Sequence, residues 1–168
     1  MKLFVYTLCW LSMRRIQWNI CAWPLTALML LLLMASVTHA EELQDFLKRV
    51  GTGNATQSDL HTNFHGSVFL GGLTYETDRD KLVEFWNQQK ASGIKLAVDS
   101  FTIVARTETP DDDGKGAVIS VVAKVSVTEN VRGSIVKIES VSHFIVRRGS
   151  NGAFQLLYTA VPKQVRHG

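Results

Sequence analysis

The strongest candidates for acid–base chemistry in this chain are Asp59, His65 and Asp99. Asp59 with His65, or Asp99 with a histidine, could move the protons of a dehydration or an isomerisation. Asp99 shares one side of a predicted strand with Phe101, and a carboxylate on an apolar surface can have a raised pKa and serve as a base. Lys95 lies on the same side, so a solvated or ion-paired Asp99 is the competing interpretation.

Two histidines, His61 and His65, have the four-residue spacing that places two metal ligands on one face of a helix. Asp59 is near them, but a third ligand at a recognisable spacing is missing. The acidic run at residues 111–113 lacks the spaced acids, glycine and terminal glutamate of a calcium loop, so we interpret it as a solvated hairpin tip. We therefore predict no metal site and no cofactor.

The elements that position these residues follow an N-terminal leader. Arg14 and Arg15 precede an apolar run at residues 25–34, and small residues stand just before Glu41. A positive segment, an apolar segment of about 7–15 residues and small residues at the cleavage point are typical of a signal peptide. The sequence therefore predicts a signal peptide over residues 1–40 and one secreted domain over residues 41–168.

An uncleaved anchor over residues 16–40 is the alternative, because a membrane span needs about 20 mostly apolar residues. Only this alternative would attach the protein to a membrane. Both interpretations place the domain outside the cytoplasm, since Arg14 and Arg15 would stay on the inner side.

The leader also carries the charge excess of the chain. The sequence has 18 Lys and Arg against 15 Asp and Glu, and three cations, Lys2, Arg14 and Arg15, lie in the leader. The remaining domain has no net charge, which argues against nucleic-acid binding. Both cysteines lie in the leader as well, so disulfides, a cysteine nucleophile and a thiolate metal site are excluded from the domain.

A modification site is predicted at Asn54, where Asn54-Ala55-Thr56 has the acceptor pattern for N-glycosylation. The surrounding stretch is polar and rich in glycine, as expected of an exposed loop.

Apolar periodicity predicts helices first and strands after them. Leu43, Phe46, Leu47 and Val50 form one helical stripe, whereas the second half of the domain alternates with a period of two between turns such as Asn-Gly. Helices are expected over residues 42–50, 58–64 and 79–91, an extended segment over residues 66–70, and strands over residues 94–108, 117–128, 134–147 and 154–161. Segregated helices and strands indicate an α+β fold.

The last hairpin carries a family resemblance. A hydrophobic strand at residues 141–148, a glycine turn and residues 154–157 resemble the closing hairpin of the nuclear transport factor 2-like superfamily, with Phe154 where tryptophan is usual. Residues 64–75 followed by a helix resemble secreted nematode members. The resemblance extends over residues 42–161 and implies a cone of N-terminal helices packed on a curved antiparallel sheet. The superfamily contains isomerases, dehydratases and cyclases as well as non-enzymatic members, many of them dimers through the sheet, so the fold alone does not specify a function.

The resemblance implies a ligand pocket between the third helix and the concave sheet. Alternation along the strand puts Ser140, Ser142 and Phe144 on one side and Val141, His143 and Ile145 on the other. The residues expected in the pocket are Tyr75, Trp86, Phe101, Ser140, Ser142, Phe144 and Tyr158. The same aromatic side chains could instead simply fill the core.

Three functions remain open at this stage. The first is a non-enzymatic domain that binds a small apolar ligand, with a homodimer formed through the sheet. The second is a cofactor-free lyase or isomerase that uses Asp59, His65 or Asp99. Ser142 argues against this chemistry, because it stands near the acidic base of cyclase-like members and an alcohol cannot abstract a proton unaided. The third is a protein-interaction module on the sheet face around Val141 and His143.

Overall fold

The computed structural model describes residues 39–70, 73–112, 114–131 and 133–167. The chain divides into two compact units, Met1–Glu42 and Leu43–Gly168. All but the last two residues of the predicted leader lie outside the described residues, so its cleavage or retention stays a prediction. Within the described ranges, no helix has both the length and the apolar character needed to cross a bilayer.

The first described element is a helix at residues 39–51. Its predicted apolar stripe is confirmed, because Leu43, Phe46, Leu47 and Val50 are each at most 6% exposed. Burial of such a stripe against a sheet supplies most of the stability of a short helix. The chain leaves the helix through Gly53, whose φ is +68° and whose N–H donates to the carbonyl of Val50 at 3.1 Å.

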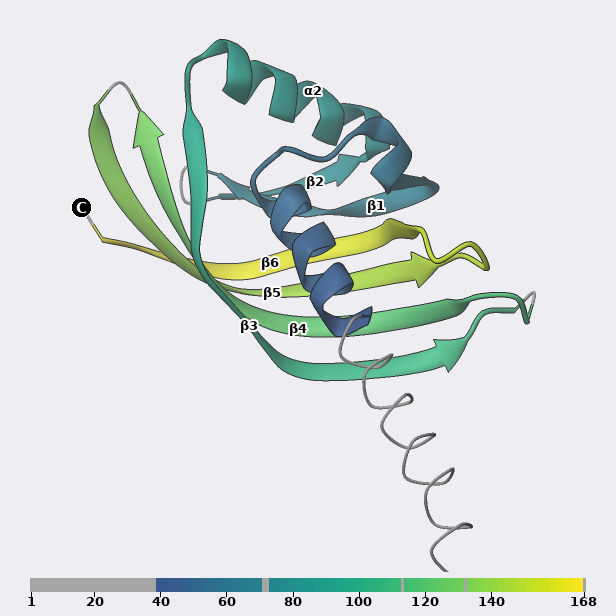
Figure 1. Cartoon of the computed structure of the whole chain (residues 1–168). Coiled ribbons are helices and arrows are strands. Elements are labelled where there is room, and N and C mark those ends of the chain that lie inside the picture. Colours follow the sequence, from purple (N-terminus) through teal and green to yellow (C-terminus); the bar gives the residue numbers. More distant parts are fainter. Residues whose placement is uncertain (1–38, 71–72, 113, 132, 168) are drawn as a thin grey trace, which may run out of the picture. The chain divides into compact units, whose positions relative to one another are not determined.

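Six strands form a single curved sheet in the order β2-β1-β6-β5-β4-β3 (Figure 1). Their bounds are Leu60–Leu70 for β1, Leu73–Asp78 for β2, Lys95–Pro110 for β3, Ala117–Val131 for β4, Ser134–Arg148 for β5 and Phe154–His167 for β6. The predicted meander of four long antiparallel strands is confirmed by the pairing of β3 to β6. The β1–β2 hairpin joins this meander through a parallel pairing of β1 with β6.

The helix predicted over residues 58–64 is wrong. Only a single 3₁₀ turn, η1 (Gln57–Asp59), forms there, and β1 begins at Leu60. Leu60 and Phe64 are 0% and 3% exposed, and their spacing of four suits either a helix or alternate positions of a strand. Pairing with β2 and β6 decides in favour of the strand.

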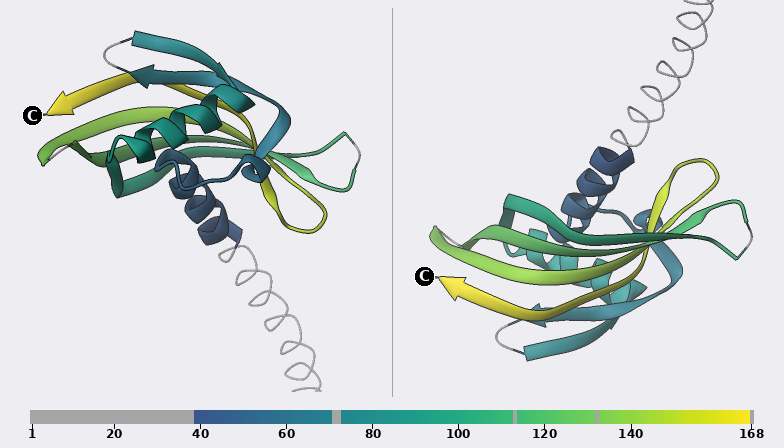
Figure 2. Two further views of the ribbon diagram at one scale, coloured as in Figure 1. Left: turned by 90° about the horizontal axis from the view of Figure 1, so that it is seen from above. Right: turned by 90° about the horizontal axis from the view of Figure 1, so that it is seen from below.

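The helix predicted over residues 79–91 is confirmed as α2 (Arg79–Ala91). The Asp78 side chain caps it by accepting a hydrogen bond from the Lys81 N–H at 3.0 Å, and Gly93, with φ +71°, follows its last turn. Leu82 and Trp86 are its buried residues. The helix of residues 39–51 and α2 lie on the same, concave side of the sheet (Figure 2).

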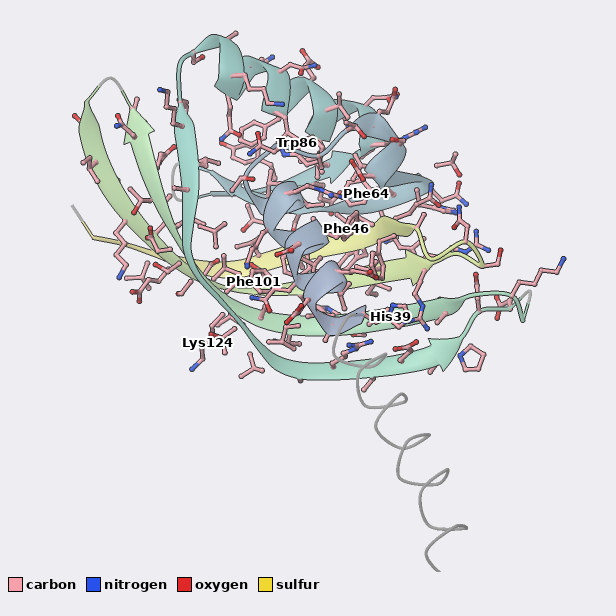
Figure 3. All side chains as sticks on the ribbon, viewed as in Figure 1. His39, Phe46, Phe64, Trp86, Phe101 and Lys124 are labelled. Carbon is pink, nitrogen blue, oxygen red and sulfur yellow. The ribbon has the colours of Figure 1, made fainter. Side chains whose placement is uncertain are left out.

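Bulges increase the curvature of the sheet. The register shifts between Val98 and Ser100 and between Ile103 and Ala105 in β3, and again twice between β5 and β6. An extra residue in one strand bends it and strengthens its twist. Figure 3 shows the outcome: Phe46, Phe64, Trp86 and Phe101 point between the sheet and the helices, whereas Lys124 projects from the opposite face.

Candidate ligand-binding cavity

A cavity of about 170 Å³ lies between the concave face of the sheet and the two helices. Most of its lining is aliphatic or aromatic. The apolar lining residues are Leu47, Val50, Val68, Leu82, Phe85, Trp86, Leu96, Val98, Phe101, Val125, Val127, Ile138, Phe144 and Val161. A dry cavity of about 150 Å³ lined by such side chains accepts a molecule the size of benzene, so this cavity has room for a small organic ligand.

Trp86 forms part of the cavity wall and is 5% exposed. It lies one helical turn after Leu82, so both side chains face the sheet. Gly53 lies directly beneath the ring, where an added Cβ would approach Trp86 Cδ1 to 3.0 Å. A side chain at position 53 would therefore crowd the indole.

The polar lining residues fall into two groups. Lys48, Gln89 and Glu129 are half-buried side chains, and we call them the mouth of the cavity. Ser140, Ser142 and Thr159 project from β5 and β6, and we call them the floor. Glu129 pairs with Val136, and Ser142 lies six residues further along β5. At about 3.3 Å per residue, Glu129 and Ser142 are about 20 Å apart along the sheet.

Five of the seven residues predicted to line the pocket do so: Trp86, Phe101, Ser140, Ser142 and Phe144. The alternation predicted along β5 is also confirmed, because Ser142 and Phe144 are 4% and 5% exposed, whereas Val141 is 42% exposed.

The prediction is wrong for Tyr75 and Tyr158. Tyr75 belongs to the edge strand β2 and is 48% exposed. Tyr158 follows a register shift: Ile145 pairs with Tyr158 but Val146 pairs with Leu156. The extra residue turns Tyr158 to the convex face, where its ring lies 5.3 Å from that of His65 and 5.9 Å from that of His143, measured between centroids.

The acid–base candidates are not brought together, and none of them lines the cavity. Asp59 accepts hydrogen bonds from the Thr56 N–H and hydroxyl at 2.7 Å each. His65 is exposed on the convex face beside Tyr158. The alternative of an acid–base pair formed from Asp59 and His65 inside the cone is therefore contradicted by their positions.

Asp99 was expected beside Phe101, and the bulge between Val98 and Ser100 explains why it is not there. The extra residue breaks the alternation, so Val98 and Phe101 both face the cavity. The exposed Asp99 carboxylate instead accepts a hydrogen bond from the Thr128 hydroxyl at 2.8 Å. The solvated interpretation of Asp99 is the one confirmed.

His61 and His65 cannot share a metal ion, because both lie in β1. Four residues of strand separate them by about 13 Å, well beyond the reach of one ion. In the part of the chain that the structure describes, no group of three potential ligands gathers around a common point.

Four polar lining residues were not among those predicted from the sequence: Lys48, Gln89, Glu129 and Thr159. Thr159 follows the same register shift that displaces Tyr158, so simple alternation assigns it to the wrong face. Glu129 continues the inward positions of β4 after Val125 and Val127, and this signal was present in the sequence. Lys48 and Gln89 are long side chains at the borders of helical stripes, where pattern is least informative.

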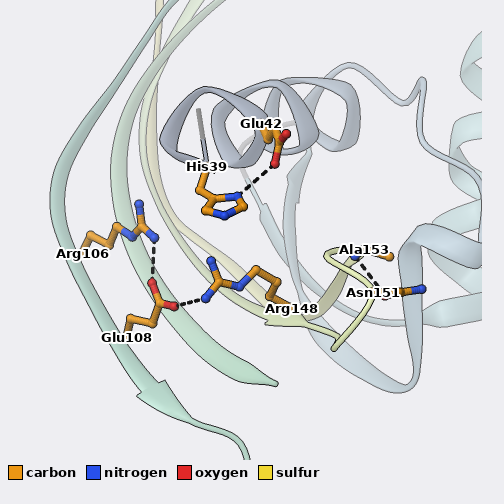
Figure 4. Close-up of polar contacts among 7 residues, drawn as sticks. All are labelled: His39, Glu42, Arg106, Glu108, Arg148, Asn151 and Ala153. Carbon is orange, nitrogen blue, oxygen red and sulfur yellow. Dashed lines mark hydrogen bonds and ion pairs between the residues drawn. The ribbon is translucent and has the colours of Figure 1, made fainter. Parts of the chain in front are cut away.

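The shortest ion pairs among the described residues lie away from the cavity lining. The Glu108 carboxylate forms ion pairs with two arginines, with nitrogen–oxygen distances of 2.7 Å to Arg106 and 2.6 Å to Arg148 (Figure 4). Arg147 binds Asp111, and this hydrogen bond keeps the pKa of the Asp111 carboxyl below its usual value. These pairs join the meander strands and the adjoining turn, and they place no charge at the floor.

No protein-family model and no curated protein matches this sequence. Solved structures do. A conserved protein from Planctomyces limnophilus DSM 3776 has 14% sequence identity and a TM-score of 0.55, with 80% of this chain and 96% of that one covered. A ketosteroid isomerase-like protein from Erwinia carotovora atroseptica has 15% identity and a TM-score of 0.50, over 75% and 92% of the two chains.

A nuclear transport factor 2-like protein of unknown function from Pseudomonas aeruginosa has 12% identity and a TM-score of 0.44, over 80% and 99% of the chains. Helices packed on a curved sheet, together with the first two similarities, show that this chain has the α+β nuclear transport factor 2-like fold. The more specific resemblance to secreted nematode members stays a prediction.

Proposed function

We propose that this is a secreted protein that binds a small, largely apolar molecule in the cavity between α2 and the concave sheet. The observation that carries the proposal is the lining itself, in which apolar side chains surround about 170 Å³ of space. Small-molecule sites combine such a lining with a few polar groups that fix orientation. The floor and the mouth supply those groups here.

Binding is favoured over catalysis by the charges of the site. The described lining residues include no histidine and one acidic residue, Glu129, which lies at the mouth. General acid–base catalysis needs its groups within hydrogen-bond reach of the reacting atoms. The floor offers hydroxyl groups, which act as bases only beside a stronger base.

Fluorescence of Trp86 tests the proposal. In the full chain with Trp10, Trp18 and Trp23 changed to Phe, Trp86 is the single tryptophan, and it lines the cavity. Naphthalene, an uncharged probe, is expected to produce a saturable change in its emission.

A matched pair of variants locates the binding. Val127→Phe places a larger side chain on the cavity side of β4 and should abolish the response. Its neighbour Thr128 is not a lining residue and interacts with Asp99, so Thr128→Phe should leave the response intact. A wild-type emission that does not saturate, or a response that survives Val127→Phe, would contradict the proposal.

The same protein is proposed to form a homodimer through its convex face. A shallow groove there has among its lining residues Ser100, Thr102, Lys124, Ser126, Glu139, Val141 and Val165. Val141 and Val165 are 42% and 44% exposed. Lys124 and Glu139 lie on neighbouring strands of this face. In a two-fold dimer, Lys124 of each copy can therefore lie opposite Glu139 of the other copy.

Sedimentation velocity tests the dimer. The wild-type chain is expected to sediment as a dimer, and Val141→Lys as a monomer, because the added lysine would lie directly opposite Lys124 and would bring a second like charge into the interface. Ile135 is on the same side of β5 and is 67% exposed but lies outside the groove, so Ile135→Lys should remain dimeric. A monomeric wild type, or a dimeric Val141→Lys variant, would exclude this interface.

A further inference from the structure

Two buried hydroxyl groups at the floor lack good hydrogen-bond partners. Ser142 is 4% exposed and Thr159 is 6% exposed. The contact of the Ser142 hydroxyl is with the Ser140 hydroxyl, at 3.4 Å, which is longer than the 2.5–3.0 Å usual for an O–H···O bond. The Thr159 hydroxyl makes no hydrogen bond with any residue that the structure describes.

These hydroxyls lie on one surface of the cavity. Thr159 in β6 pairs with Phe144 in β5, and Ser142 lies two residues from Phe144 on the same side of that strand. All three line the cavity. A buried hydroxyl without a partner destabilises a protein, so two of them at the end of an apolar cavity indicate partners supplied by the ligand.

The charges of the site limit what that partner can be. The floor itself, Ser140, Ser142 and Thr159, has no charged side chain: Glu129 is about 20 Å from Ser142 along the sheet, and Lys48 belongs to the helix of residues 39–51. A charged group at the floor would lose its hydration without gaining a counter-charge, whereas a neutral oxygen needs only a hydrogen bond. Hydroxyl side chains can donate to a carbonyl and can either donate to or accept from an alcohol.

We propose that the ligand has an apolar body ending in a neutral oxygen, an alcohol or a ketone, and that Ser142 and Thr159 bind this oxygen at the floor of the cavity. The inference rests on the proposed ligand binding and adds the chemical class and the orientation of the ligand. The apolar body then extends from the floor toward Trp86 and the mouth.

Equilibrium dialysis with three probes on the full chain tests this inference. Naphthalene has no polar group, 2-naphthol adds a neutral hydroxyl, and 2-naphthoate adds a charge. We expect 2-naphthol to bind about fivefold to tenfold more tightly than naphthalene, as one or two net hydrogen bonds allow. The carboxylate of 2-naphthoate should make it the weaker binder of the two polar probes.

The hydroxyls are removed with little change of shape by Ser142→Ala and Thr159→Val. The double variant should lose the preference for 2-naphthol and keep its affinity for naphthalene. Its unfolding midpoint without ligand should stay the same or rise, because the removed hydroxyls lack good partners. Ser120→Ala is the matched control: this hydroxyl binds His143 Nε2 at 2.8 Å away from the cavity, and the variant should keep the preference.

The outcomes separate the two proposals. If naphthalene binds but 2-naphthol binds no better, or if the preference survives in the double variant, the neutral-oxygen inference is overturned and the cavity remains a binding site. A marked loss of stability in both single variants would show that the hydroxyls are structural, and would also overturn it. If none of the probes binds, both proposals fall.

Discussion

Gly53 shows how one residue positions the cavity wall. Its φ of +68° lies in the left-handed region, and an added Cβ would approach the Trp86 ring to 3.0 Å. The first constraint comes from the backbone and the second from the neighbouring side chain. The loop after the first helix can therefore follow its path beneath the indole only without a side chain at position 53.

Replacing Gly53 by alanine should reduce the free energy of unfolding by about 2–5 kcal/mol, since left-handed strain costs about 1–2 kcal/mol and overpacking adds about 1–3 kcal/mol. Gly114 is the matched control, because its φ is +65° but an added Cβ would meet nothing within 4 Å. Gly114→Ala should therefore show the strain alone. Equal losses in the two variants, measured by urea denaturation, would mean that the Trp86 contact contributes nothing.

At the scale of the element, the orientation of α2 depends on Asp78, the residue that precedes and caps it. The Asp78 carboxylate accepts from the Lys81 N–H at 3.0 Å, and this hydrogen bond, followed by the Lys81 side chain, keeps the pKa of Asp78 below its ordinary value. Fixing the first turn of α2 in this way fixes the positions of Leu82 and Trp86 on the cavity wall.

Asp78→Ala should lower the thermal unfolding midpoint by a few degrees, whereas Asp78→Asn keeps a capping oxygen and should lose less. The pKa of Asp78 is lowered in the folded state only. The wild type is therefore expected to be more stable than Asp78→Asn above about pH 4, and this difference in stability should shrink as the pH falls through the folded-state pKa. Melting curves at pH 7, 5 and 3 measure this. An advantage that persisted unchanged at pH 3 would show that the carboxylate charge is not its source.

Some elements of this fold can be predicted from the sequence and others cannot. The sequence predicted the four long strands and α2 correctly, because their apolar periodicity is long and uninterrupted. The end of α2 was predictable from Gly93. Residues 58–64 were not, since Leu60 and Phe64 fit two periods and only pairing with distant strands distinguishes them. Asp99 and Tyr158 were assigned to the wrong faces because a bulge adds one residue and reverses the alternation, and single-residue insertions leave no mark in the pattern of residue types.

For the whole molecule, the compartment remains the prediction with the widest consequences. Asn54 is exposed, and its side chain is engaged only locally, donating to the Thr52 hydroxyl at 3.1 Å. Expression in a eukaryotic secretory host should therefore give a glycosylated protein whose gel mobility increases after enzymatic deglycosylation. Asn54→Gln should remove the difference, and Asn151→Gln, an exposed asparagine outside the acceptor pattern, should not. An unmodified wild-type protein would argue against passage through that pathway, or against use of this asparagine.

The parallel pairing of β1 with β6 has a consequence for how the chain is made. His65 pairs with Tyr158, so the β1–β2 hairpin joins the main sheet only after residue 158 has left the ribosome. Such long-range pairing is slow to form. The six-stranded sheet therefore cannot be completed until β6 emerges, and until then β1 and β5 lack the strand that lies between them.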